Sequence, residues 1–230
     1  MLELLISVIG LGLASTLSPV ILAISVSLLT GKENESENGS NKPLGRLIAF
    51  TLGGVVVAVA IALAGAEAWN GALSLSKTAH AYARQLDFAL ALALLAFGVW
   101  EALPLFRKTA DSEKAKKEKR QARIASSGAL ALFAIGFLVN ATNFDAVLFN
   151  LAAVREIAAA SISDATEIAL IGVADFFFLA PCLLPLFVYV AAPKQTKQVL
   201  APVGRAMQKY GAWLVPAIFI VFGLYLFTKI

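Results

Sequence analysis

"TLSPVILAIS" (Thr16–Ser25) lies inside the first long apolar stretch of the chain, and its proline determines how that stretch can fold. A proline within a helix removes one backbone hydrogen bond and clashes with the preceding turn. Ser18 followed by Pro19 is also typical of a helix N-cap followed by proline at the first helical position. We therefore expect the first apolar stretch to form two half-helices that meet at Ser18.

The composition is typical of an integral membrane protein. Hydrophobic residues make up 59% of the 230 residues, charged residues make up 15%, and the mean hydropathy is +0.80. A soluble domain is closer to half apolar and a quarter charged. The net charge of +4 suits loops on the cytoplasmic side of a membrane, so we expect no nucleic-acid partner. The single cysteine, Cys182, excludes an internal disulfide.

Six apolar segments predict six transmembrane helices. Each segment reaches the length of about 20 residues that a helix needs to cross ~30 Å of hydrocarbon. The segments are residues 3–30, 46–68, 86–106, 128–154, 167–192 and 209–229. The first is too long for the apolar core of a cleavable signal, so we expect it to be retained. The predicted fold class is an all-α integral membrane protein.

Basic residues predict the orientation. Residues 31–46, residues 107–123 and the stretch after the fifth span together hold 15 of the 19 Lys and Arg residues. The positive-inside rule places these three loops in the cytoplasm and both termini outside. The loop at 107–123 alone holds eight basic residues, which serve topology or attract anionic lipid and other partners.

A constant offset of 125 residues relates the two halves of the chain. It carries Phe97-Gly98 onto Phe222-Gly223, although the second and fifth spans match poorly. It also superimposes the polar residues of the first and fourth spans, pairing Ser15 with Asn140, Ser18 with Asn143 and Ser25 with Asn150. Three spans in each half put the second copy into the membrane from the opposite side, as in many secondary transporters. We predict an inverted repeat of residues 1–106 and 128–230, joined by a basic cytoplasmic linker at 107–127.

Each of these polar triplets falls on one face of a continuous helix, because positions i, i+3 and i+10 lie within about 80° of one another. Small polar residues can simply join helices by hydrogen bonds. Buried amides are costlier unless they have partners or water. If both helices break, the second half-helices direct their N-termini toward the midplane, where the helix dipole favours an anionic group and unwound carbonyls hold a cation.

Asp145 and Asp175 are the ionisable residues placed deep in the predicted spans. A charge in hydrocarbon is costly and indicates function by default. Proton carriage, cation binding, a substrate amine or a packing hydrogen bond all stay open for them, and Asp145 joins Asn143 only if the fourth helix is broken. The predicted substrate- or ion-binding residues are Ser15, Ser18, Pro19, Ser25, Asn140, Thr142, Asn143, Asp145, Asn150 and Asp175.

No catalytic or cofactor site is predicted. The sequence has one histidine and no cysteine–histidine cluster with the spacing of metal ligands, so any metal would use Asp145 and Asp175. No nucleophile–base pair supports an intramembrane enzyme. We expect Gly53-Gly54 to allow either close approach of two helices or hinging, and Gly98 and Gly223 to serve packing.

The chain resembles the lysine exporter superfamily and, within it, the family of GPL/sulfolipid-addressing (GAP or Sap) proteins. The matching features are the proline break, the Asn/Asp cluster of the fourth span and the basic central loop. The matching segments are "LSPVILAISVSLL" (17–29), "GFLVNATNFDAVL" (136–148) and "GAWLVPAIFIVFGLYLF" (211–227). Thiol carriers of similar layout use one cysteine in each repeat, and the nickel/cobalt exporters have a histidine-rich first helix; both features are absent from this sequence. Amino-acid exporters often have Asn-Pro-Gly where this chain has Ser18-Pro19-Val20.

The resemblance implies a secondary transporter of the bacterial inner membrane that exports a small solute by alternating access. It implies proton or Na⁺ coupling without a bound cofactor, membrane lipid as a partner and assembly as a homodimer. One alternative is a divalent-cation exporter that uses Asp145, Asp175, Asn140 and Asn143 as oxygen ligands. Another is a non-transporting lipid-addressing or scaffold protein that acts through residues 107–123.

Overall fold

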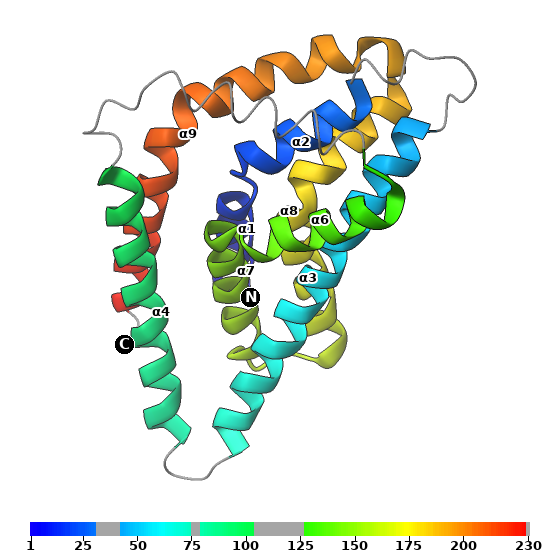
Figure 1. Ribbon diagram of the computed structural model, residues 1–230. Helices are drawn as coiled ribbons and strands as arrows, with labels where there is room; N and C mark the ends of the chain where they lie inside the picture. The colour runs from blue at the N-terminus through cyan, green and yellow to red at the C-terminus, as the bar shows by residue number, and fades with distance from the viewer. Residues whose placement is uncertain (31–41, 75–78, 104–126, 229–230) are drawn as a thin grey trace.

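The computed structural model describes residues 1–30, 42–74, 79–103 and 127–228, which are nearly all helical and contain no strand (Figure 1). The predicted basic loop at 107–123 lies outside these residues, as does almost all of the predicted linker at 107–127.

The first apolar stretch is broken where its sequence predicts. Helix α1 (Leu2–Ser15) and helix α2 (Pro19–Thr30) meet at an angle of 62°. Pro19 has no N–H, and the first backbone bond of the new helix runs from Leu22 N to Ser18 O (3.1 Å). The Ser18-Pro19 break is therefore confirmed.

The fourth predicted span is broken in the same way. Helix α6 (Ala129–Ala141) and helix α7 (Phe144–Ala158) meet at 69°. Asn143 occupies the N-cap position of α7, and its carbonyl accepts from Val147 N (3.0 Å), but its side chain forms no capping hydrogen bond. The second half-helices thus begin at Pro19 and at Phe144, 125 residues apart.

The remaining helices are longer than predicted. They are α3 (Lys42–Ser74), α4 (Ala79–Ala102), α8 (Asp164–Ala191), the short 3₁₀ helix η4 (Pro193–Gln195) and α9 (Thr196–Phe227). The polar stretch after the fifth span was expected to be a loop, but it forms the first part of α9. This part lies across the top of the molecule before α9 turns and runs alongside α4 (Figure 1).

By length and composition, two to four membrane spans are supported. Helix α8 and the segment Pro43–Ala66 of α3 are each long and apolar enough to cross a membrane. The bent pairs α1–α2 and α6–α7 bring the number of spans to four if each pair is counted as one span. Helices α4 and α9 contain shorter apolar segments, Phe88–Trp100 and Pro216–Tyr225. The six predicted spans are not confirmed.

Close approach at Gly53-Gly54 is confirmed. A β-carbon added at Gly53 would collide with the backbone of α6 at Phe133, and one added at Gly136 would collide with the α3 backbone at Phe50. Helices α3 and α6 therefore cross with their backbones in contact, which requires glycine on both sides.

Glycines also bring α4 and α9 together. A β-carbon at Gly98 would lie 3.1 Å from the Ile220 side chain, and one at Gly223 would lie 2.7 Å from the Leu95 side chain. At the offset of 125 residues, Gly98 corresponds to Gly223 and Leu95 corresponds to Ile220. The two contacts are therefore reciprocal, and the predicted packing role of both glycines is confirmed.

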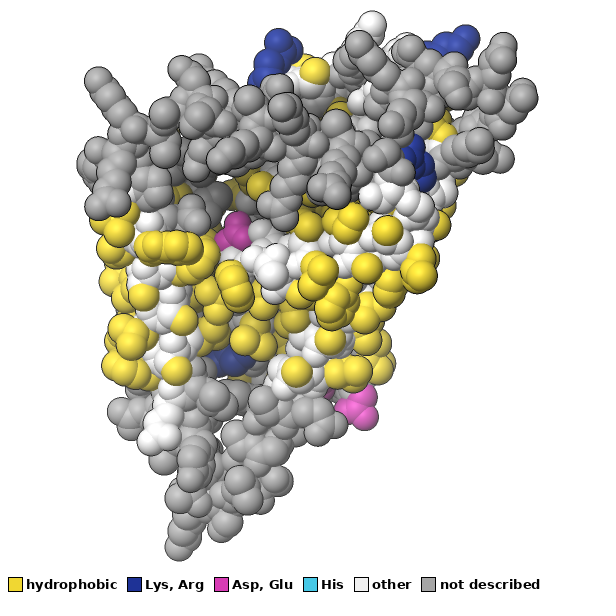
Figure 2. All heavy atoms as spheres, viewed as in Figure 1, with side chains coloured by type: hydrophobic (Ala, Val, Ile, Leu, Met, Phe, Trp, Pro, Cys, Tyr) yellow, Lys and Arg dark blue, Asp and Glu magenta, His cyan; other side chains and the backbone are white. Residues whose placement is uncertain are grey.

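The outer surface is suited to lipid. On the face shown in Figure 2, hydrophobic side chains form a band across the middle of the molecule, while the described basic side chains lie mainly toward one end. Large apolar side chains are exposed on several helices, including Leu130 at 83%, Ile168 at 72% and Val190 at 66%. An exposed apolar surface of this extent is typical of a protein embedded in a membrane.

Candidate functional site

The polar residues at the two breaks point into the protein. Ser15, Ser18 and Asn140 are each at most 2% exposed. Ser15 Oγ donates to the Gly12 carbonyl (2.7 Å), and Asn140 Nδ2 donates to the Gly136 carbonyl (2.8 Å). These bonds satisfy donors within the same helix.

Asparagine atoms near the α6–α7 break are buried without a hydrogen bond. Asn140 Oδ1 and Asn143 Nδ2 have no partner among the residues that the structure describes. The Asn140 amide lies against α3, since a β-carbon at Gly54 would be 3.0 Å from its Nδ2. Buried polar atoms are nearly always paired, so one acceptor and one donor here are left for water, an ion or a ligand.

A second polar contact joins α7 to α8. Asn150 is 1% exposed, and its Nδ2 donates to Asp175 Oδ1 (3.0 Å). Asn150 Oδ1 is buried and, within the described parts of the chain, accepts no hydrogen bond. Asp175 is half-buried and lies within three residues of the middle of α8. The structure therefore brings these two predicted site residues together.

Asp145 lies on the same side of the break as Asn150. It is half-buried and is the second residue of α7. The positive end of the helix dipole stabilises an acidic side chain in the first turn. The break required for Asp145 to join the Asn143 region is present, and α7 packs directly on α8, which carries Asp175.

Three predicted residues are placed differently. Thr142 is exposed, and its hydroxyl donates to the Leu138 carbonyl (2.7 Å). Ser25 is fully buried, but its hydroxyl lies beside the Cys182 thiol of α8 without a hydrogen bond of good geometry. Pro19 is half-buried at the start of α2. The shared face expected for a continuous helix does not extend across a 62° bend, which separates Ser25 from Ser15.

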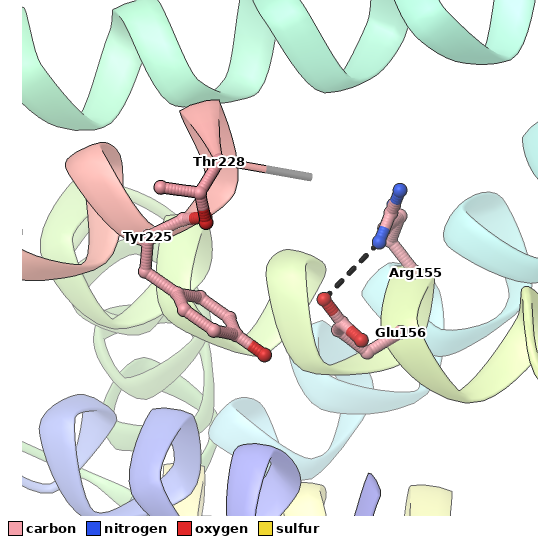
Figure 3. A network of polar contacts seen from close by, with 4 residues as sticks. All are labelled: Arg155, Glu156, Tyr225 and Thr228. Atoms are coloured by element: carbon pink, nitrogen blue, oxygen red, sulfur yellow. Dashed lines mark hydrogen bonds and ion pairs between the residues drawn. The ribbon is translucent and has the colours of Figure 1, made fainter. Parts of the chain in front are cut away.

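The structure adds a charged pair that the sequence analysis missed. The predicted fourth span ends at residue 154, but α7 continues to Ala158, and Arg155 Nη1 lies 3.1 Å from Glu156 Oε1. The two side chains are 16% and 7% exposed. Figure 3 shows Tyr225 of α9 extending toward the pair. The apolar residues after the pair, Ile157 and Ala158, were the signal that the helix extends this far.

The described residues contain no group of three or more His, Cys, Asp or Glu side chains that could hold a metal ion. Asp145 and Asp175 therefore gain no further ligand of these types from the described residues. The divalent-cation hypothesis would depend on asparagine oxygens or on a ligand shell completed by water.

The lipid-facing apolar helices, the two bent helix pairs and the buried polar residues beside their breaks define a helical, membrane-embedded protein. A family model described as "Sap, sulfolipid-1-addressing protein" matches residues 8–229. The chain belongs to this family, which confirms the resemblance predicted from its motifs. Comparisons with curated proteins and with solved structures gave no significant match.

Proposed function

We propose that this protein is a secondary transporter that exports a small solute by alternating access at its two helix breaks. One observation carries the proposal. Two bent helix pairs begin their second halves 125 residues apart, at Pro19 and Phe144, and buried asparagine atoms without partners lie beside the second break. Irregular backbone at membrane depth is tolerated where it lines a cavity, which is where a transporter binds its substrate.

An inverted repeat of six spans is part of the proposal. The reciprocal contacts of Gly98 with Ile220 and of Gly223 with Leu95 support it, since a local two-fold axis would produce such a pair. The contact of α3 with α7 likewise has its counterpart in the contact of α8 with α2. Residues 1–106 and 128–230 would then rock against each other around the breaks.

The binding groups follow from the placement of the polar side chains. The N-terminus of α7 and the asparagine amides near it would bind the substrate. Asp145 and Asp175 would respond to a coupling proton or cation, because acidic groups within a membrane protein are costly unless they serve such a role.

The excess of basic residues in three loops supports the orientation that we propose. We place the protein in the bacterial inner membrane with both termini outside, in contact with lipid and assembled as a homodimer. The family description names a sulfolipid. We therefore add anionic lipids to small solutes and ions as candidate substrates.

The same description favours a second function from another class. A lipid-addressing scaffold would act through the basic loop at 107–123 rather than through the breaks. Divalent-cation export remains a third candidate that would use Asp145 and Asp175.

The transport proposal is tested with the full chain in proteoliposomes that contain a pH-sensitive dye. The probes, added separately, are an amino-acid mixture, Mn²⁺ and a fluorescent sulfated lipid. We expect one probe class to move in response to a pH gradient, with at least a tenfold loss for Asp175→Asn and little change when residues 108–122 are deleted. The opposite pattern, in which the deletion abolishes activity and both Asp145→Asn and Asp175→Asn are silent, would establish the scaffold instead.

A further inference from the structure

We infer that Asp175 and Asn150 form a proton-binding pair, in which a proton on Asp175 supplies the hydrogen bond that Asn150 Oδ1 lacks. The inference deepens the proposed function, on which its role in transport rests, by selecting a proton as the coupling ion at this site. The pair itself can be tested without any transported substrate.

The inference begins with the hydrogen bonds that the pair makes and lacks. Asn150 Nδ2 donates to Asp175 Oδ1 at 3.0 Å, while Asn150 Oδ1 is buried without a partner among the described residues. An ionised carboxylate offers only acceptors. It can therefore satisfy the amide nitrogen of Asn150 but never the amide oxygen. A buried acceptor left in this state is costly.

One proton removes this mismatch. Bound to Asp175 Oδ2, it creates an O–H donor that can point to Asn150 Oδ1, while Nδ2 keeps its bond to Oδ1 of the acid. Acid and amide are then joined by two parallel hydrogen bonds, and the pair is neutral. The step takes one proton from water and breaks no covalent bond. A metal cation would instead need a shell of several oxygen ligands.

The surroundings of the pair are apolar. Phe149, next to Asn150, and Ala174, next to Asp175, belong to one cluster of buried hydrophobic residues. In such surroundings a neutral acid is favoured over an isolated carboxylate.

Among the described residues, Asp175 makes one polar side-chain contact, the hydrogen bond that it accepts from Asn150. Helix α2 carries no charged residue. The described titratable or charged side chains on α8 and on the other elements packed against it are Glu3 (α1), Arg46 (α3), Asp145, Arg155 and Glu156 (α7), Asp164, Glu167, Cys182 and Tyr189 (α8), Lys194 (η4), and Arg205, Tyr210 and Tyr225 (α9). None of these is hydrogen-bonded or ion-paired to Asp175.

Infrared difference spectroscopy of the full-length protein in lipid vesicles tests the pair directly. On acidification we expect a carboxylic-acid C=O band that shifts in D₂O, is lost in Asp175→Asn, and changes frequency in Asn150→Leu. The matched control, Asp164→Asn at the exposed start of α8, should retain the band. The inference is overturned if Asp175→Asn keeps every titrating carboxyl band, or if Na⁺ at constant pH removes the band as effectively as alkali.

Thermal unfolding provides a second readout that does not depend on the infrared band. Asp175→Asn replaces the acid by an amide that can form the same two hydrogen bonds, so its melting temperature should match or exceed that of the wild type and should depend less on pH. The wild-type melting temperature should fall as the pH rises, and Asp175→Leu should melt lower than both. An Asp175→Asn protein no more stable than Asp175→Leu would contradict the pair.

These outcomes separate the two proposals. If the infrared band is assigned to Asp175 but no probe is transported, the proton pair stands and the transport role falls. If Asp175→Asn removes no band yet abolishes transport, the transporter stands and the proton pair falls.

Discussion

At the α6–α7 break, asparagine side chains hold polar atoms inside the protein without a partner from the described residues. Asn140 Oδ1 is an acceptor and Asn143 Nδ2 is a donor, so together they can bind a group that both gives and accepts a hydrogen bond. The serines at the equivalent positions of the first break are buried too, but Ser15 satisfies its donor within α1. The two breaks thus have similar geometry and different chemistry, and the second holds the stronger binding groups.

Some of this site follows from residue type alone, and some does not. Ser18-Pro19 and Asn143 are local signals, because capping and proline act on their own turn. The outward position of Thr142 and the contact of Ser25 with Cys182 depend on bends of 69° and 62°, which a calculation on a straight helix does not include. The Arg155–Glu156 pair was missed because basic residues near span ends are usually solvated.

Removing the Glu156 charge should destabilise the protein. Glu156 is 7% exposed, and Glu156→Gln would remove the charge that lies 3.1 Å from the mostly buried guanidinium of Arg155. A buried hydrogen bond to a charged group contributes roughly 1.5–3 kcal/mol, and we expect a loss in this range. Thermal unfolding in detergent is the measurement, with Glu3→Gln, at an exposed site, as the matched control. An unchanged melting temperature for Glu156→Gln would show that the pair adds nothing to stability.

At the scale of elements, glycine determines which helices cross. Gly136 meets the α3 backbone at Phe50, and the neighbouring Asn140 is thereby held against Gly54. The glycines of α3, α4 and α9 were expected to serve packing from sequence. The partner helix of each was not predictable, because a single sequence does not reveal which distant backbone fills the space.

Gly136→Ala should therefore separate α3 from α6. The added methyl group has no room, and overpacking of this kind costs about 1–3 kcal/mol. Gly172→Ala is the matched control: it makes the same change within a helix, and nothing lies within 4 Å of the added β-carbon. We expect a lower melting temperature for Gly136→Ala and an equal or higher one for Gly172→Ala. Equal effects of the two substitutions would refute the tight crossing.

The ends of the helices were less predictable from the sequence than their apolar centres. The apolar segments predicted the cores of the helices, because hydrophobic residues identify the buried or lipid-facing portion. Helix α9 begins at Thr196 rather than near residue 209, because its polar first part lies along one end of the molecule instead of crossing the apolar band (Figure 1). Hydropathy predicts which part of a helix lies in the membrane, but it does not predict how far the helix continues outside the membrane.

At the scale of the whole molecule, the offset of 125 residues connects the breaks with the packing of α4 on α9. The second half-helices begin at Pro19 and Phe144, α4 and α9 end at Ala102 and Phe227, and the glycine contacts between these two helices are reciprocal. These agreements favour two related halves that can move as units. Alternating access of the breaks is the central claim of the transport proposal.

Thiol accessibility at the first break tests that claim most directly. Ser18→Cys, in a Cys182→Ser background, places a nearly isosteric thiol at a position that is 2% exposed. Right-side-out and inside-out vesicles are treated with a membrane-impermeant maleimide, and the wild type, whose Cys182 is fully buried, serves as the control. Alternating access predicts labelling of residue 18 from both sides of the membrane, with each rate changed by pH. Labelling from one side alone, or from neither, would contradict it.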